Sequence, residues 1–188
     1  MKVLISGAGI AGPCLAYWLQ RQGIQITLVE RSAQLRTGGY VIDFWGAGFD
    51  VADRMGLVPQ LLEKGYKVKE VRAVDRNGKR VSGFAADVLD RLMRGRVTSL
   101  PRGELAASIS AALGDRVETI FGDSITALED NGHEVRVQFE RRLQQRSCGL
   151  GHVGLASLAG QVVPFLVHFA RQGGNLQLLQ WRRQWHDG

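Results

Sequence analysis

Three glycines and one carboxylate near the amino terminus stand at a spacing that has a chemical use. Gly7, Gly9 and Gly12 follow the pattern G-x-G-x-x-G, and Glu30 lies 18 residues beyond the last of them. In such a pattern the first glycine permits a tight turn, the second lets the backbone approach a pyrophosphate, and the third lets a helix pack closely on a strand. A carboxylate about 20 residues further on accepts hydrogen bonds from ribose hydroxyls. Because it would repel a 2′-phosphate, the pattern predicts the adenosine half of FAD or NAD rather than that of NADP.

The segments around these residues supply the structural context that the pattern requires. Residues 2–6 form a short apolar run, which predicts a strand that ends at the first glycine. Pro13 suits a first helical turn, because its missing N–H would have no partner there, and Gly23 is placed to end that helix. Residues 25–30 alternate and contain β-branched side chains, so they predict a second strand. The order strand, helix, strand is that of the βαβ unit, which binds phosphates at the helix amino terminus.

Antiparallel segments are expected after this unit, where a simple NAD dehydrogenase would continue with alternating strands and helices. Asn77-Gly78 and the turn at residues 130–132 predict two hairpins. Before the first hairpin we expect an extended stretch over residues 41–44 and a helix over 49–55. Between the two hairpins we expect a short strand, a helix from about residue 101 and then a further strand. The sequence therefore predicts an α/β fold: a Rossmann-type βαβ FAD-binding domain with inserted antiparallel hairpins. The hairpins favour FAD as the cofactor and disfavour a fragment of a classical NAD dehydrogenase.

Residues 1–140 resemble the N-terminal part of the FAD-dependent monooxygenases of the aromatic-ring hydroxylase (p-hydroxybenzoate hydroxylase-like) family. The resemblance rests on the glycine motif, on the strand end Val29-Glu30-Arg31, on the loop RTGGYVIDFWG and on LPRGEL. It implies that FAD is bound and that NAD(P)H serves as a transient reductant. It also implies that a flavin hydroperoxide hydroxylates a small aromatic or polyketide-like substrate. In such a reaction the cofactor performs the difficult step, and the protein orients it and excludes water.

The resemblance also assigns individual residues to the cofactor. Glu30 would bind the ribose and Arg31 would pack near the adenine, while Asp43 would lie close to the flavin and Arg102 would contact FAD. The predicted cofactor-binding residues are Gly7, Gly9, Ile10, Ala11, Gly12, Glu30, Arg31, Asp43 and Arg102. No catalytic residue is predicted. The four histidines are scattered without the spacing of metal ligands, so no metal is expected.

Each charged residue of this set also has a simpler interpretation. Glu30 could be a solvated strand end, and Arg31 could be a loop charge, as could Arg36. Asp43 could cap the turn that follows it. Arg102 could be a surface arginine, although it stands at a helix start, where the helix dipole disfavours a cation and so favours an anionic partner.

The composition excludes several other classes of protein. The chain has 188 residues, 45% of them hydrophobic, which is enough for one domain with a buried core. Its two cysteines, Cys14 and Cys148, stand in no paired motif, so we expect a cytoplasmic protein without disulfides and a packing role for Cys14. Met1 leads directly into the first expected strand, so no signal peptide is expected. Residues 1–140 hold 18 Lys and Arg against 17 Asp and Glu, and this balance argues against a nucleic-acid partner.

The character of the chain changes from residue 141 onward. Residues 141–188 hold 6 basic residues against 1 acidic residue, and we expect an atypical basic and apolar tail that is disordered or read out of frame. The apolar run at 149–170 is long enough to span a membrane, but polar residues and a proline interrupt it, so a membrane span is not expected. Since members of the family are about twice this long, 1–140 is interpreted as an incomplete FAD-binding domain of a truncated member. A non-catalytic nucleotide-binding module or an inactive remnant is the alternative.

Overall fold

The protein was analysed as a computed structural model, which describes residues 2–36, 38–66, 68–130, 134–141, 146–149, 153–155 and 166–167. The chain divides into two compact units, which are described separately below. The first unit comprises residues 1–36 and 109–188, and the second comprises residues 37–108. The second unit is therefore an insertion within the sequence of the first.

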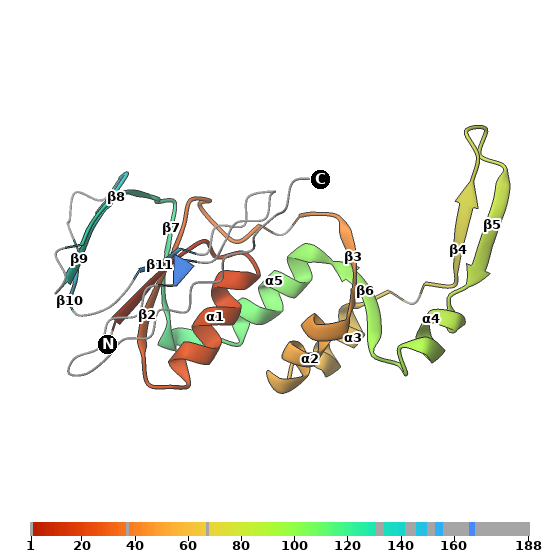
Figure 1. Ribbon diagram of the computed structural model, residues 1–188, viewed down its shortest axis with the longest axis horizontal. Helices are drawn as coiled ribbons and strands as arrows, with labels where there is room; N and C mark the ends of the chain where they lie inside the picture. Colours follow the sequence, from red (N-terminus) through yellow and green to blue (C-terminus); the bar gives the residue numbers. More distant parts are fainter. Residues whose placement is uncertain are drawn as a thin grey trace, which may run out of the picture. The chain divides into compact units, whose positions relative to one another are not determined.

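A five-stranded sheet forms the centre of the first unit. Strands β1 (Lys2–Ser6) and β2 (Gln25–Glu30) pair in parallel, and helix α1 (Ala11–Gln20) connects them (Figure 1). The strand order is β12-β11-β1-β2-β7, and every pairing but that of β12 is parallel. The remaining strands of this sheet are β7 (Glu118–Phe121), β11 (Val153–Leu155) and β12 (Leu166–Val167). The predicted strands over residues 2–6 and 25–30 and the βαβ order are confirmed.

A smaller antiparallel sheet completes the first unit. Its order is β10-β9-β8, formed by β8 (Ile125–Asp130), β9 (Glu134–Phe139) and β10 (Arg146–Gly149), and a 3-10 turn, η1 (Gly114–Arg116), precedes β7. The second predicted hairpin is confirmed by the β8–β9 pairing, although its turn at residues 131–133 lies outside the described residues. Most of 141–188, including most of the apolar run at 149–170, also lies outside them, so the division at residue 140 stays a prediction. Within the described ranges no helix is long and apolar enough to cross a membrane.

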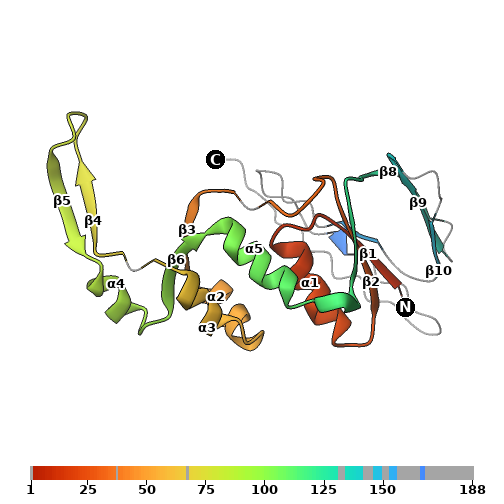
Figure 2. The same ribbon diagram turned by 180° about the vertical axis from the view of Figure 1, so that it is seen from behind.

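The second unit contains a two-stranded sheet flanked by helices. Strand β3 (Val41–Trp45) pairs antiparallel with β6 (Val97–Pro101), and helices α2 (Gly46–Arg54) and α3 (Val58–Lys64) lie beside these strands (Figure 2). Helix α5 (Arg102–Ala111) begins where β6 ends, close to the expected start. The helix expected over 49–55 begins three residues earlier than predicted. Sequence analysis missed α3 altogether.

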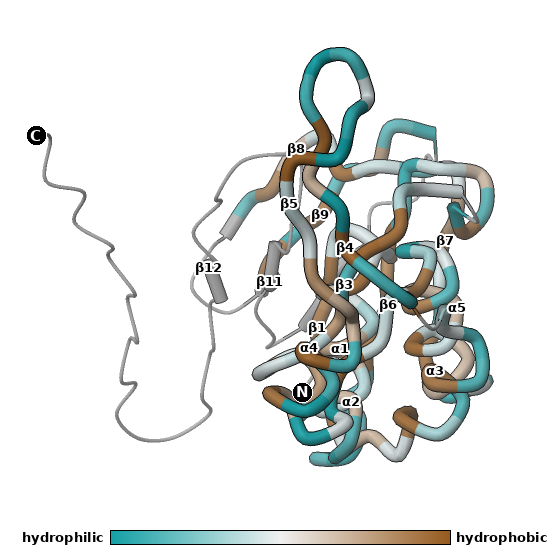
Figure 3. The backbone as a smooth tube through the Cα atoms, turned by 90° about the vertical axis from the view of Figure 1, so that its right-hand side faces the viewer, coloured by the Kyte–Doolittle hydropathy of each residue, from teal (hydrophilic) through white to brown (hydrophobic). Residues whose placement is uncertain are grey.

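A hairpin and a short helix form the rest of the second unit. Strands β4 (Glu70–Val74) and β5 (Arg80–Ala85) pair antiparallel and are followed by α4 (Asp87–Leu92), which was not predicted. The hairpin turn is hydrophilic, whereas both strands carry hydrophobic residues (Figure 3). A carboxylate oxygen of Asp75 accepts the backbone N–H groups of Asn77 at 2.8 Å and Lys79 at 2.9 Å. Gly78 has a φ of 78°, so the structure confirms the predicted turn at Asn77-Gly78.

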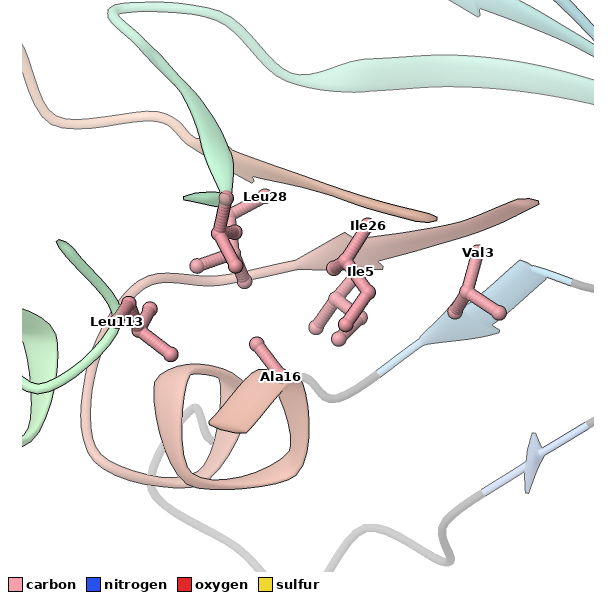
Figure 4. Packing of buried hydrophobic residues seen from close by; sticks show 7 residues of the cluster. Val3, Ile5, Ala16, Ile26, Leu28 and Leu113 are labelled. Carbon is pink, nitrogen blue, oxygen red and sulfur yellow. The ribbon is translucent and has the colours of Figure 1, made fainter. Parts of the chain in front are cut away.

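Hydrophobic side chains bury both faces of the central sheet. On one face Ala16 of α1 points toward Ile5 and Leu28 of the strands, in a cluster that also contains Val3, Ile26, Leu113 and Val117 (Figure 4). On the other face Leu4 and Val29 pack with Ile120 of β7 and with Val135, Val137 and Phe139 of β9. Neighbouring residues of a strand point to opposite faces, which is why β1 and β2 are nearly continuous apolar runs. Each fully buried aliphatic side chain contributes about 1.5–3 kcal/mol, so packing on both faces stabilises β1 and β2 at the centre of the sheet.

Candidate nucleotide-binding site

A tight turn at the carboxyl end of β1 begins the site. Gly7 has a φ of 102°, a value that strains any residue with a side chain. Its N–H donates a hydrogen bond of 2.7 Å to the carbonyl oxygen of Val29 in β2. The turn is thus anchored to the neighbouring strand and requires glycine at this position.

Gly12 lies against the backbone of this turn. A Cβ atom placed on Gly12 would lie 1.9 Å from the carbonyl oxygen of Gly7, and real Cβ atoms do not approach that closely. Any side chain there would push α1 away from the turn. The sequence pattern predicts that the third glycine lets the helix approach the strand closely. The structure has this close approach.

The amino terminus of α1 is open to an anion. Ile10 occupies the N-cap position without a side-chain hydrogen bond, and the first turn contains no acidic residue. The first N–H groups of a helix have no partner within the helix, and the helix dipole makes this end positive. Pro13 is buried in the first turn, where it removes an N–H that the helix does not need. This donor set fits the pyrophosphate of a dinucleotide.

Glu30 is at the end of β2, beside the glycine turn. One oxygen of its carboxylate accepts the N–H of Ala8 at 2.9 Å, and the other accepts the N–H of Ser32 at 2.9 Å. The side chain is half-buried. Partial burial by itself would raise the pKa of Glu30, but the N–H groups of Ser32 and Ala8, the Ser32 hydroxyl and the nearby Arg36 outweigh it. The net effect holds the pKa of Glu30 below its ordinary value, so the residue is ionised near neutral pH.

Two basic residues follow this carboxylate in the loop. Arg31 is exposed. Exposure is expected both of a residue that covers a bound adenine and of a simple surface charge. The Nε of Arg36 donates to the hydroxyl of Ser32 at 3.0 Å. Ser32 thus connects Glu30 with Arg36. Ser32 and Ala8 were not predicted as site residues. Both act largely through their backbone N–H groups, and the type of a residue does not indicate what its N–H group binds.

Asp43 and Arg102 belong to the second unit, so each is described within that unit. Asp43 of β3 lies opposite Ser99 of β6, and its carboxylate accepts the Ser99 hydroxyl at 2.6 Å. It does not cap the helix that follows, because the N-cap of α2 is Trp45, which makes no side-chain capping bond. The N–H of Arg102 donates to the carbonyl oxygen of Tyr40 at 3.1 Å. Arg102 is half-buried, and its guanidinium has no ion pair with any residue that the structure describes.

The structure brings the predicted residues of the first unit together at the carboxyl ends of β1 and β2. These are Gly7, Gly9, Ile10, Ala11, Gly12, Glu30 and Arg31. Within the described part of the chain, no cluster of three or more His, Cys, Asp or Glu residues could hold a metal ion. The four histidines, at 133, 152, 168 and 186, all lie outside the described residues.

Comparison with known families identifies the class to which this site belongs. Residues 1–148 match a family model described as "FAD binding domain". The chain therefore belongs to this family of FAD-binding domains, and FAD is the family's cofactor. The prediction of FAD over NAD, made from the inserted hairpins, is confirmed.

Several relatives carry the name of a flavin-dependent or FAD-dependent monooxygenase. The chain is 38% identical over 141 residues to an FAD-dependent monooxygenase of Sarocladium schorii, and this match covers 73% of the chain and 33% of that protein. It is 30% identical over 164 residues to a flavin-dependent monooxygenase of Legionella longbeachae, covering 87% of the chain and 42% of the relative. An uncharacterized protein of Mycobacterium tuberculosis is 40% identical over 143 residues. These matches confirm the resemblance that the motifs carry.

Solved structures of flavoproteins have a similar fold. The tetracycline destructase Tet(51) superposes with a TM-score of 0.66 at 32% identity, over 82% of this chain and 38% of that one. HpxO of Klebsiella pneumoniae, solved with FAD and uric acid, superposes with a TM-score of 0.63 at 25% identity, over 80% and 38%. The predicted fold class is confirmed. The chain spans about two fifths of the length of the relatives it matches.

Proposed function

We propose that this chain is the FAD-binding part of a flavin-dependent monooxygenase and binds FAD through the βαβ unit of its first unit. One observation carries the proposal: the carboxylate of Glu30 lies beside the glycine turn and the uncapped amino terminus of α1. This places a ribose acceptor next to a set of N–H donors for phosphate, which is the arrangement that an adenosine diphosphate group needs.

The proposed roles of the residues follow from their positions. The N–H groups around Gly9, Ile10 and Ala11 hold the pyrophosphate, while Gly7 and Gly12 allow the turn and the close approach of α1. Glu30 binds the ribose hydroxyls, and Arg31 covers the adenine. Asp43 and Arg102 contribute to the flavin end of the cofactor, a role supported by their match to the family's motifs.

Bound FAD supplies the redox chemistry of this family, with NAD(P)H as the source of the hydride. The residues of this chain bind and orient the cofactor. Hydroxylation of a small aromatic or polyketide-like molecule is the activity proposed for the complete system, because relatives such as the tetracycline destructase act on small molecules. A reducing, cytoplasmic setting is proposed from the two cysteines, which stand in no paired motif.

A nucleotide-binding module without catalysis is the second candidate. It is supported by the site itself, whose assigned residues bind a nucleotide and include none with a catalytic role. Cofactor binding is common to both candidates, whereas hydride transfer requires the complete enzyme. The two are therefore separated by oxidation of NADPH after FAD binding has been established.

Titration with FAD tests the proposal directly. The purified protein is mixed with FAD, and binding is followed by quenching of flavin fluorescence and by the visible spectrum after gel filtration. We expect stoichiometric binding that Glu30→Gln weakens about tenfold, the cost of one charge-assisted hydrogen bond. Glu63→Gln, an exposed carboxylate on α3, is the matched control and leaves the affinity unchanged. Failure to retain FAD at all, in a protein with an intact far-UV spectrum, would overturn the proposal.

A further inference from the structure

A buried carboxyl group follows β7 in the first unit and has no role in the site described above. Asp123 stands two residues beyond the end of β7 and is 2% exposed. Burial of a carboxyl group costs free energy unless hydrogen bonds compensate for it. The hydrogen bonds of Asp123 therefore indicate what this residue does.

The carboxyl group of Asp123 connects two segments of the chain. Its Oδ1 atom accepts the N–H of Ser124 at 2.9 Å and the N–H of Arg141 at 3.0 Å. Arg141 lies two residues beyond the end of β9. A backbone hydrogen bond of 2.9 Å from the N–H of Glu140 to the carbonyl oxygen of Ser124 joins the same two segments. Residues 122–124, which we call the β7 turn, are thus fixed to the end of β9.

The backbone of the β7 turn binds the chain that follows β2. The N–H of Asp123 donates to the carbonyl oxygen of Glu30 at 3.2 Å. The N–H of Gly122 donates to the carbonyl oxygen of Ser32 at 2.9 Å. Strands β2 and β7 pair in parallel as far as Glu30 and Phe121. The turn therefore continues this pairing beyond the ends of both strands.

These two bonds act on the residues that form the proposed ribose site. Glu30 carries the carboxylate, and the N–H of Ser32 is one of the two backbone donors that fix it. Connecting segments are more mobile than the strands they follow unless other groups hold them. A binding group needs such support, because it must lie within about 0.5 Å of its productive position. The β7 turn supports the backbone of Glu30, while Ala8 and Ser32 support its side chain.

We propose that Asp123 is a positioning residue: through the β7 turn it holds Glu30 where the carboxylate can accept the ribose hydroxyls of FAD. Asp123 itself touches no ligand in this role. That Glu30 accepts the ribose rests on the proposed function, whereas its placement by Asp123 does not. The placement can therefore be measured without any ligand.

The pKa of Glu30 reports the placement of its carboxylate. It is measured by NMR titration of protein labelled at the glutamate carboxyl carbons, with Glu30→Gln to assign the signal. Asp123→Ala should raise this pKa toward its ordinary value, because the N–H groups of Ser32 and Ala8 no longer meet the carboxylate. Loss of a nearby negative charge would by itself lower the pKa, so the sign of the change separates the two causes.

Leu113→Ala is the matched structural control. Leu113 is 3% exposed and packs in the cluster that contains Ala16 of α1, so its truncation lowers stability without touching residues 30–32. The pKa of Glu30 should keep its wild-type value in this variant. An unchanged pKa in a folded Asp123→Ala protein, or an equal rise in both variants, would overturn the proposal.

Arg141 supplies a second pair of variants if Asp123→Ala does not fold. Arg141→Pro removes the N–H that Asp123 accepts, at an exposed position. Arg141→Ala removes the same guanidinium but keeps that N–H. We expect the pKa of Glu30 to be higher in Arg141→Pro than in Arg141→Ala, and equal values would contradict the proposal.

Recognition of the ribose gives a readout that a purely structural role would not change. ADP and 2′,3′-dideoxy-ADP, which lacks the ribose hydroxyls, are compared by calorimetry. We expect the wild type to prefer ADP about tenfold, the value of one charge-assisted hydrogen bond, and Asp123→Ala to lose most of this preference. Leu113→Ala should keep it, because a general loss of structure weakens the binding of both nucleotides alike. An unchanged preference in Asp123→Ala would overturn the proposal.

The two proposals fail in different ways. If the wild type binds neither nucleotide, or binds both equally, the proposed function fails, and the pKa of Glu30 still decides the role of Asp123. If the wild type prefers ADP but the pKa of Glu30 does not respond to Asp123→Ala, FAD binding stands and the positioning role falls.

Discussion

The carboxylate of Glu30 holds the backbone N–H of Ala8 at 2.9 Å, across 22 residues of sequence. This bond ties the end of β2 to the glycine turn after β1. The same carboxylate is the proposed acceptor for the ribose of FAD. One side chain therefore serves both the stability of the turn and the recognition of the ligand, and a substitution there is expected to change both.

Glu30→Gln should lower the free energy of unfolding even when no FAD is present. The amide cannot serve both N–H donors as an ionised carboxylate does, and we expect a loss of about 1 kcal/mol for partly exposed bonds. Urea unfolding followed by far-UV circular dichroism measures the change. The control is Glu63→Gln. The exposed carboxylate of Glu63 has no hydrogen bond to any residue that the structure describes, so this variant should be as stable as the wild type.

The stabilisation by Glu30 should depend on pH with a definite sign. Because its pKa lies below the ordinary value of about 4.3, the contribution is complete above that value. It is lost as the pH falls through the lower pKa of the folded state. The difference in unfolding free energy between the wild type and Glu30→Gln should therefore be constant above about pH 5 and shrink below pH 4. A difference that grew on acidification would contradict the assignment.

Gly12→Ala should be far more harmful than alanine at another glycine of the same βαβ unit. Its Cβ would meet the carbonyl oxygen of Gly7 at 1.9 Å, so backbone must move, at a cost of about 3 kcal/mol. Gly23→Ala is the comparison. Gly23 has a φ of 73° but open space around it, so only conformational strain of about 1 kcal/mol is expected. Thermal unfolding of both variants checks the order, and equal effects would mean that the contact with Gly7 is unimportant.

Gly65 and Thr98 should be energetically coupled. The backbone of Gly65, with a φ of −78°, would suit any residue. However, a Cβ on Gly65 would lie 2.0 Å from the hydroxyl oxygen of Thr98. Thr98 is a buried residue, 8% exposed. We expect Gly65→Ala to cost about 2 kcal/mol in the wild type. It should cost about 1 kcal/mol less when Thr98→Ala has removed that oxygen. A double-mutant cycle with no coupling would contradict the geometry.

The thiol of Cys14 should react slowly with alkylating reagents. Burial raises the pKa of Cys14, and a hydrogen bond with Trp18 offsets only part of the shift. Since the thiolate is the reactive form, iodoacetamide at pH 8 should modify this residue about ten times more slowly than it modifies free cysteine. Cys148→Ser leaves Cys14 as the single target. A rate equal to that of free cysteine would show that the thiol is not protected by burial.

Sequence reasoning succeeded where a local pattern determines the structure. The apolar runs of β1 and β2, the glycines between them and the Asn77-Gly78 turn each carry their signal within a few residues, and all were confirmed. Pro59, near the start of α3, is a local signal of a helix start, although no helix was predicted there.

Pairing between distant segments was beyond a single sequence. Nothing near Asp43 indicates that β3 pairs with β6 or that the Ser99 hydroxyl would be its partner, because the two residues are 56 positions apart. The roles of Ala8 and Ser32 were missed for a different reason: their N–H groups are common to nearly all residues. The assignment of Arg31, Asp43 and Arg102 to the cofactor stays a prediction.

The insertion of the second unit has a consequence for the order in which the chain folds during synthesis. The hydroxyl of Thr27 in β2 donates to Glu118 in β7, 91 residues later, so β2 leaves the ribosome long before its neighbour exists. At about 5–20 residues per second, translation takes roughly 5–18 s to cover that distance. During this time the outer edge of β2 offers unpaired N–H and C=O groups to any other strand. The glycine turn is thus among the first parts of the protein to be made, and the sheet that supports it is among the last to close.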